Sequence, residues 1–305
     1  MHLLACIYKR CSGSTMPKLR APSHAGSWYS DSSSELGQQI DKWMAQVQRP
    51  DGFHARAIIA PHAGYSYCGH VMAYAYKMID PTKVKRVFLL GPSHHVYTTK
   101  CCLSSTDAYD TPLGSMTIDQ GVYAQLRATG AFEEMDVDTD EAEHSLELHT
   151  PYIVRALAGR AFTLVPIMVG SLSGDSEARY GKLLAPYLDD PANLFILSSD
   201  FCHWGRRFSY QWHDEGKGPI WQAIRWLDHE GMAAIETGEA AAFAQYQAQY
   251  RNTICGRHPI GVFLNMLPHA STKFEIKFRH YDQSSKCESK IDSSVSYAAA
   301  TAAAL

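Results

Sequence analysis

Short, continuous apolar runs are the clearest pattern along this chain. Three runs contain only apolar residues and a fourth is mostly apolar: 57–60, 87–90, 194–197 and 162–169. Strands of a parallel sheet that helices cover on both faces are apolar throughout, whereas strands with one solvent face alternate. The runs therefore predict buried, parallel strands. Alternating segments near 274–281 and 293–298 predict later strands.

Segments with helical periodicity separate these runs. The predicted helices cover about 69–79, 120–129, 144–158, 176–188, 217–236 and 240–250. Strands that alternate with helices are typical of an α/β protein, so we predict a mostly parallel or mixed central sheet with helices on both faces. We assign residues 22–305 to this single domain and residues 1–21 to a disordered N-terminal extension. The small-residue segment Ala298–Leu305 is interpreted as a frayed tail.

Composition narrows the class of protein. With 305 residues, of which 46% are hydrophobic, the chain can bury one full core. A net charge of −3 gives no field that would recruit nucleic acid, and no apolar run approaches the roughly 18–20 residues that span a bilayer. Eight scattered cysteines favour reduced thiols in a cytoplasmic protein. The basic residues in 1–20 leave a mitochondrial presequence open as an alternative.

Histidines follow three of the predicted buried strands. His62 comes after the first, His94 after the second and His203 after the third. The carboxyl ends of strands form the ligand crevice of an open α/β sheet, so we expect these histidines to lie close together. Imidazole is the commonest protein ligand for transition metals. The pattern therefore predicts a mononuclear metal site at this edge of the sheet.

A metal held by two or three imidazoles also needs an anionic partner, and two residues qualify. Cys255 lies beside Gly256, which lets the backbone turn, and Arg257, which favours thiolate. The other candidate is Asp200, three residues before His203. Cys255 could equally be an inert buried thiol, or form a nucleophilic pair with His258. Asp200 could instead cap a helix, with His203 as a surface imidazole.

Other residues near these positions have weaker signals. The segment 143–149 (EHSLELH) lacks the spacing of a zinc-binding helix, because His149 leaves the face that His144 and Glu147 share. We interpret its glutamates, Glu143 and Glu147, as part of an ordered helix near the site. Four aromatic residues are expected to wall the pocket, with ordinary core packing as the alternative: Trp28, Tyr65, Tyr67 and Trp204.

Several motifs together resemble a known family. They are SHAGSWY at 23–29, APHAGY at 60–65, GPSHH at 91–95, EHSLE at 143–147, SSDFCHWG at 198–205 and CGRHPIG at 255–261. They resemble the Memo family (mediator of ErbB2-driven cell motility), and the resemblance covers about residues 22–300. The family is similar in fold to class III extradiol dioxygenases, which are non-haem iron enzymes that open catechol rings.

The resemblance implies roles for individual residues. His62, His94 and Cys255 would ligate iron or copper, and zinc also suits this ligand set. His203 would stand where the dioxygenases keep an acid–base histidine, with Asp200 beside it. Those enzymes have a carboxylate where this chain has Cys255. The softer thiolate favours copper, which argues against ring cleavage.

These residues lead to one main functional hypothesis and two alternatives. The main hypothesis is a metal-dependent oxidoreductase, on an unknown small substrate, with a role in cell-motility signalling. The first alternative is a non-catalytic adaptor that binds phosphotyrosine peptides in the same crevice, where Arg257 and His258 could contact the peptide. The second is a zinc hydrolase in which His203 acts as the base.

Overall fold

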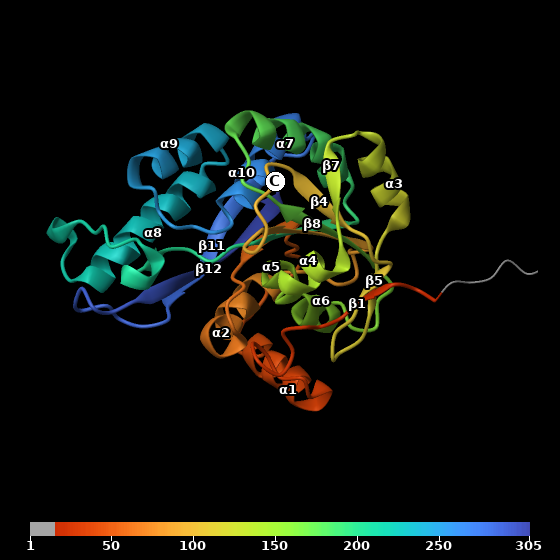
Figure 1. The fold of residues 1–305 in the computed structure, drawn as a ribbon, viewed down its shortest axis with the longest axis horizontal. Helices are drawn as coiled ribbons and strands as arrows, with labels where there is room; N and C mark the ends of the chain where they lie inside the picture. Colours follow the sequence, from red (N-terminus) through yellow and green to blue (C-terminus); the bar gives the residue numbers. More distant parts are fainter. Residues whose placement is uncertain (1–15) are drawn as a thin grey trace, which may run out of the picture.

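The computed structural model describes residues 16–305 and contains a nine-stranded mixed sheet (Figure 1). Four neighbouring strands at its centre run parallel, in the order β2 (Ala57–Ala60), β9 (Asn193–Ser198), β3 (Arg86–Pro92) and β8 (Thr163–Val169). These strands contain the four apolar runs, so the prediction of buried parallel strands is confirmed. Their carboxyl ends lie at one edge of the sheet, which brings the segments after β2, β3 and β9 together.

Strands of both directions extend this parallel centre. Beyond β8, β4 (Cys101–Ser104) is antiparallel to β8 and is followed by β7 (Phe132–Met135). Beyond β2, β12 (Ser294–Ala304) is antiparallel and pairs with β11 (Phe274–Gln283) and β10 (His203–Trp204). A separate small sheet contains β1 (Leu19–Arg20), β5 (Ala108–Tyr109) and β6 (Met116–Thr117).

Helices cover both faces of the sheet, as the sequence predicted (Figure 1). On one face, α7 (Gly174–Asp189) and α10 (Arg257–Met266) pack on β9 and β3. On the other, α2 (Tyr65–Tyr76) packs on β2 and β12, and α5 (His144–Glu147) packs on β3 and β8. The remaining helices are α1 (Ser33–Met44), α3 (Gln120–Ala128), α4 (Val137–Ala142), α6 (Thr150–Ala156), α8 (Ile220–Glu236) and α9 (Ala240–Tyr250).

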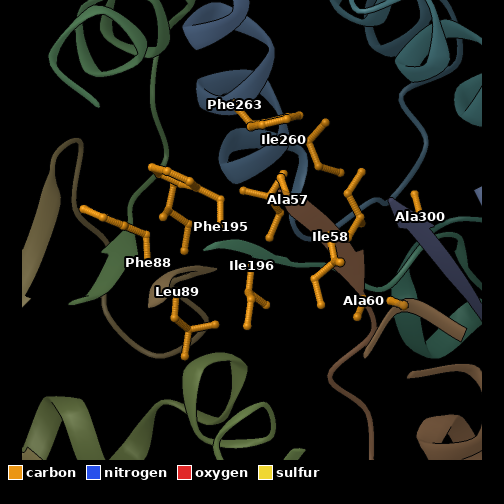
Figure 2. Packing of buried hydrophobic residues seen from close by; sticks show 14 of the residues in the cluster. Ala57, Ile58, Ala60, Phe88, Leu89, Phe195, Ile196, Ile260, Phe263 and Ala300 are labelled. Carbon is orange, nitrogen blue, oxygen red and sulfur yellow. The ribbon is translucent and has the colours of Figure 1, made fainter. Parts of the chain in front are cut away.

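The central strands are buried on both faces, which explains why they lack a polar alternation. Figure 2 shows Phe88, Phe195 and Ala57 directed toward Ile260 and Phe263 of α10. The next residue along each strand points to the opposite face: Leu89, Ile196 and Ile58. Each of these strand residues is at most 1% exposed. The rings of Phe88 and Phe195 stack at 4.6 Å between centroids.

The helix predicted over 144–158 is two helices. Observed α5 ends at Glu147 and α6 begins at Thr150. Pro151 has no N–H to donate to the carbonyl of Glu147, and the hydroxyl of Thr150 donates to that carbonyl instead at 2.7 Å. The predictions over 120–129, 176–188 and 240–250 agree with α3, α7 and α9 to within two residues at each end.

The two ends of the chain require corrections. Ala298–Leu305 is not a frayed tail, because β12 continues to Ala304 and its alanines at 298–300 are completely buried between β2 and β11. At the other end, Arg20 is 0% exposed and forms ion pairs with Asp140 and Glu147. The domain therefore begins before residue 22. The expected disorder of residues 1–15 lies outside the described residues.

Two expectations from composition concern the whole chain. The six cysteines within residues 16–305 are all free thiols, whereas Cys6 and Cys11 lie outside the described part. Over the same described residues, no helix is both long and apolar enough to cross a membrane.

Candidate metal centre

Three of the predicted ligands meet at the carboxyl edge of the sheet. His62 follows β2, His94 follows β3, and Cys255 ends the loop before α10. One ligand atom from each of the three lies within 4.8 Å of the other two. The Nε2 atom of His62 is 3.1 Å from the Sγ atom of Cys255. The expected convergence of these residues is therefore present in the structure.

The hydrogen bonds of His62 determine which ring nitrogen is free. Its Nδ1 lies 2.6 Å from the hydroxyl of Ser198, and that hydroxyl donates its proton to the carbonyl of Ser145 at 2.7 Å. A hydroxyl has only one proton to donate, so Ser198 must accept from Nδ1–H of His62. Nε2 of His62 therefore carries no proton, and its lone pair points at Cys255. Burial lowers the pKa of His62 well below its ordinary value, so the ring is neutral.

Glu143 orients His94 in the same way. Its Oε1 accepts from Nδ1 of His94 at 2.9 Å, and its Oε2 accepts from the backbone N–H of His94 at 2.6 Å. Burial alone would raise the pKa of Glu143, but the hydrogen bond and charge of His94 outweigh it and lower the pKa to about 2. A permanently ionised acceptor keeps the proton of His94 on Nδ1. Nε2 of His94 is therefore the ring nitrogen left to bind a metal ion.

Ser145 connects the two histidine supports. Its backbone N–H donates to Oε1 of Glu143 at 2.8 Å, while its carbonyl accepts from Ser198. Its hydroxyl donates to the carbonyl of Pro92, two residues before His94. The two imidazoles are thus held by one continuous network through α5. This gives the motif at 143–147 a specific structural role, which its spacing alone did not reveal.

Cys255 approaches β9 closely because its neighbour is glycine. A Cβ atom on Gly256 would lie 2.3 Å from Cβ of Ser199, and Gly256 N–H donates to the hydroxyl of Ser199 at 3.1 Å. The backbone of Gly256 has φ −84°, which any residue can adopt. The backbone turns at Cys255–Gly256 as predicted, but this turn does not require a glycine. The function of Gly256 is to permit close packing of two backbones.

The environment of Cys255 favours the thiol when no metal is bound. Burial, and then the charge of Asp200, raise the pKa of Cys255 well above its ordinary value. Arg257 was expected to favour thiolate, but its side chain is exposed and is not among the main causes of this shift. The thiol can donate to the unprotonated Nε2 of His62. A metal ion would have to replace this proton.

Asp200 and His203 lie beside the three ligands. Oδ1 of Asp200 accepts from the backbone N–H of His62 at 2.9 Å, and its own N–H donates to Sγ of Cys255 at 3.2 Å. Asp200 therefore holds the backbone of His62 and the side-chain sulfur of Cys255, and the group of possible ligands includes Cys255 rather than Asp200. No helix begins at residues 200–203, so the helix-cap interpretation is wrong.

His203 has one ring nitrogen available for proton transfer. Its Nδ1 lies 2.9 Å from the carbonyl of Phe201 and 3.1 Å from that of Thr253. Both partners are acceptors, so Nδ1 carries a proton and Nε2 is the nitrogen left for proton transfer. The side chain is half-buried.

His144 is a further imidazole at the site that the sequence analysis did not select. Its ring lies 4.4 Å from that of His94 and 5.4 Å from that of His62, between centroids. Burial, followed by the charge of His94, lowers the pKa of His144 to about 3. The ring of Trp28 lies 4.5 Å from that of His144, between centroids. His144, Glu143 and His94 also form a second group whose donor atoms lie within 4.8 Å of one another.

The four aromatic residues expected at the pocket divide into two pairs. Trp28 and Tyr67 are 37% and 59% exposed, and both line a hollow of about 550 Å³ next to Ala63 and Gly64. Tyr65 and Trp204 are at most 1% exposed, so they belong to the core. Their polar atoms donate to the carbonyls of Leu148 and Trp212. Core packing is therefore correct for this second pair.

The remaining peptide-binding candidates lie at the start of α10. Arg257 is exposed, and Nδ1 of His258 is 2.7 Å from Oε1 of Glu177 on α7. The contact of Cys255 is with His62 rather than with His258. Arg207, from a different loop, lines the hollow beside Trp28 and Tyr67.

The donor set suits a transition-metal ion. In a tetrahedral site with bonds of roughly 2.0–2.3 Å, nitrogen and sulfur donors lie about 3.5 Å apart. The observed separation of 3.1 Å between His62 and Cys255 is close to this value and fits a thiol hydrogen bond in the absence of metal. Two imidazoles and one thiol that can ionise leave further coordination positions open.

Comparison with known proteins adds independent information. A family model described as Memo-like protein matches residues 20–301. Protein MEMO1 of Rattus norvegicus and of Homo sapiens are each 51% identical over 288 residues, which covers 92% of this chain and 96% of the relative. The protein memo-1 homolog of Caenorhabditis elegans is 45% identical over 284 residues, which covers 92% of this chain and 81% of the relative.

A solved structure is more distant. The uncharacterized protein JW3007 from Escherichia coli K12 matches with a TM-score of 0.42 and 14% identity, covering 80% of this chain and 99% of that chain. Similarity at this level supports no argument about the fold.

Proposed function

This chain belongs to the Memo-like protein family, and from its site geometry we propose that it is a metalloprotein with one redox-active metal ion. His62, His94 and Cys255 would hold iron or copper. The resemblance to the family also suggests a role in cell-motility signalling, which we include in the proposal. Zinc suits the same donors and would instead support a hydrolase.

One observation carries this proposal. Both histidines have Nδ1 committed to an acceptor, Ser198 for one ring and Glu143 for the other. Both Nε2 lone pairs therefore remain available beside the Sγ atom of Cys255. Metal-binding histidines are commonly fixed in this manner by a hydrogen bond to the nitrogen that does not bind the metal. Two histidines with a purely structural role would not need to direct their remaining nitrogens at one thiol.

The surrounding residues define what chemistry the site could perform. A bound iron or copper ion would supply one-electron exchange or Lewis acidity. Nε2 of His203 would accept or donate a proton at the edge of the crevice, because its Nδ1 is committed to two carbonyls. Asp200 would act indirectly, by holding the backbone of His62.

Cys255 sets this site apart from a ring-cleaving dioxygenase. We propose a dioxygenase-like fold for the domain, supported by the motifs at the strand ends. A thiolate is a softer ligand than the carboxylate of those enzymes and favours copper. The proposed activity is therefore that of an oxidase or a related oxidoreductase. Ring cleavage is not part of the proposal.

Metal analysis is the direct test. The protein would be purified without added metal, analysed for bound iron, copper and zinc, and then assayed for consumption of O₂ or superoxide. We expect about one equivalent of iron or copper, and loss of both metal and activity in His62→Ala. Zinc alone, without redox activity, would favour the hydrolase. A protein that binds no metal would contradict the proposal.

A second function is favoured by the hollow beside the metal centre. Among its described lining residues, Arg207 is the only charged one, and Trp28 and Tyr67 offer exposed rings. Such a surface could bind a phosphotyrosine peptide, as arginine pairs with phosphate and aromatic rings pack on the tyrosine. Titration with a phosphotyrosine peptide and its unphosphorylated form tests this adaptor function. Equal affinity for both peptides would exclude it.

A further inference from the structure

Asp228, on α8, is a carboxylate that the proposed chemistry does not use. It is 0% exposed, yet within residues 16–305 no lysine or arginine lies within ion-pair distance of it. A buried carboxylate is costly unless hydrogen bonds satisfy it. Three neutral donors do so: the backbone N–H of Cys202, the side-chain amide of Asn252 and the hydroxyl of Tyr281.

The first of these bonds holds the segment after β9. Oδ1 of Asp228 accepts from Cys202 N–H at 3.2 Å. Cys202 lies between Asp200 and His203, the two residues that border the ligands. Its backbone carbonyl also accepts from Ser296 N–H on β12 at 2.9 Å. Asp228 therefore joins α8 to the segment 199–205, which we name the His203 segment.

The second bond holds the segment that leads to Cys255. Nδ2 of Asn252 donates to Oδ1 of Asp228 at 2.9 Å and to the hydroxyl of Tyr246 at 2.8 Å. Asn252 is 3% exposed and lies three residues before Cys255. We name residues 251–256 the Cys255 segment. The same carboxylate oxygen thus accepts one hydrogen bond from each of the two segments.

Direct bonds between the two segments complete the arrangement. The hydroxyl of Thr253 accepts from His203 N–H at 2.7 Å and donates to the carbonyl of His203 at 3.0 Å. Closer to the ligands, Asp200 N–H donates to Sγ of Cys255. Together, these hydrogen bonds hold the His203 segment and the Cys255 segment as one unit. This fixes where Sγ of Cys255 lies relative to Nε2 of His62. Among the described residues, Asp228 is the only residue of α8 that accepts hydrogen bonds from both segments.

We infer that Asp228 is a positioning residue of the metal centre, which clamps the His203 segment and the Cys255 segment together so that Sγ of Cys255 faces His62. The consequence for metal binding rests on the proposed function, whereas the position of the thiol does not. Loss of the clamp should let the Cys255 segment open locally, because neither segment forms regular helix or a long strand.

Several substitutions distinguish loss of the clamp from a general loss of stability. Asp228→Leu removes all three acceptor contacts, and Asn252→Ala removes only the link to the Cys255 segment. Asp228→Asn should retain both links, because its side-chain oxygen can accept from Cys202 and Asn252 while its N–H₂ donates to the hydroxyl of Tyr281. Asp282→Leu, at an exposed position of β11, is the matched control. Alkylation of Cys255 by iodoacetamide, followed by mass spectrometry of the metal-free protein, reports the position of the thiol.

We expect alkylation of Cys255 to be at least about tenfold faster in Asp228→Leu and Asn252→Ala, since local opening exposes a partly buried thiol. Cys68 and Cys101, both buried elsewhere, should react no faster, which a general loss of stability would not allow. Asp228→Asn and Asp282→Leu should resemble wild type. If Asp228→Leu fails to fold, Asn252→Ala decides alone. A folded Asn252→Ala protein with wild-type reactivity at Cys255 would overturn the inference.

Metal affinity provides the second measurement. Titration of the wild-type protein with Co²⁺ should show a thiolate-to-cobalt absorption band. Asn252→Ala should bind Co²⁺ about tenfold more weakly and show a weaker band, as is usual when a residue that supports a metal ligand is removed. If wild type binds no metal, the proposed function fails while the alkylation result still decides the clamp. Normal metal binding with unchanged alkylation in Asn252→Ala would contradict the clamp alone.

Discussion

Glu143 accepts two hydrogen bonds from His94, one from the ring Nδ1 and one from the backbone N–H. Glu143→Gln would place an amide N–H₂ among these donors and the N–H of Ser145, so at least one contact must be lost. We expect metal affinity to fall roughly 10–100-fold, as is usual when the hydrogen-bond partner of a metal-binding histidine is removed. Competition with a chromophoric chelator measures this change.

Glu134→Gln is the control for that experiment. Glu134 is exposed and pairs with Arg127 at the surface, far along the chain from any proposed ligand. The substitution removes the same charge and should leave metal affinity unchanged. Equal loss in both variants would mean that overall charge, and not the orientation of His94, controls binding.

Adjacent histidines provide a sharper comparison. His94 supplies a ligand atom to the cluster, whereas His95 belongs to neither group of possible ligands among the described residues, and its ring lies 6.0 Å from that of His144. His94→Ala should abolish metal binding, and His95→Ala should leave the metal stoichiometry largely intact. Metal analysis of both purified variants tests the pair. A similar loss in both would show that His94 has been assigned incorrectly.

The sequence was sufficient to predict the centre of this fold and the meeting of its ligands. Continuous apolar runs identified β2, β3, β8 and β9, and parallel direction then required the histidines that follow these strands to share one edge. This succeeded because burial on both faces leaves a strong, local signal in the sequence. Three helices, α3, α7 and α9, were also evident from periodicity alone.

The rest depends on contacts between residues far apart in the chain. Arg20 is buried because Asp140 and Glu147, more than a hundred residues later, accept its hydrogen bonds. The small alanines of β12 looked like a tail, yet they lie between β2 and β11. His144 was missed because its place beside His94 follows from the packing of α5 on β3. Short helices such as α4 and α5 have too few residues to show a period.

The buried ion pair of Arg20 predicts a large effect on stability. Arg20→Ala would leave Asp140 and Glu147 buried without their cation, and breaking a buried pair usually costs about 3–5 kcal/mol. We expect a decrease of this size in the free energy of unfolding in urea. Lys18→Ala, at an exposed position of the same segment, should change it by no more than about 0.5 kcal/mol. If Arg20→Ala leaves the free energy of unfolding unchanged, the attachment of β1 through this residue does not stabilise the domain.

The state of Cys255 predicts how metal affinity depends on pH. Burial raises the pKa of this thiol well above its ordinary value, so binding must release its proton throughout the neutral range. Burial also keeps His62 neutral by lowering its pKa, so this ring releases none. The apparent affinity should therefore rise about tenfold per pH unit between about pH 6 and 8. An affinity that stays constant over this range would mean that no thiol proton is displaced.

Cys255→Ser tests which residue supplies the anionic ligand. A hydroxyl is a harder and poorer donor than a thiolate, so affinity for Cu(I) should fall by more than the roughly 10–100-fold expected for a lost outer partner. Affinity for Fe(II) should fall less, because iron accepts oxygen donors more readily. Asp200 cannot easily substitute, since Oδ1 of its carboxylate already accepts from the backbone of His62. Parallel titrations with both metals measure the difference. If Cys255→Ser binds copper as tightly as wild type, Cys255 is not a ligand, and Asp200 must turn from His62 toward the metal.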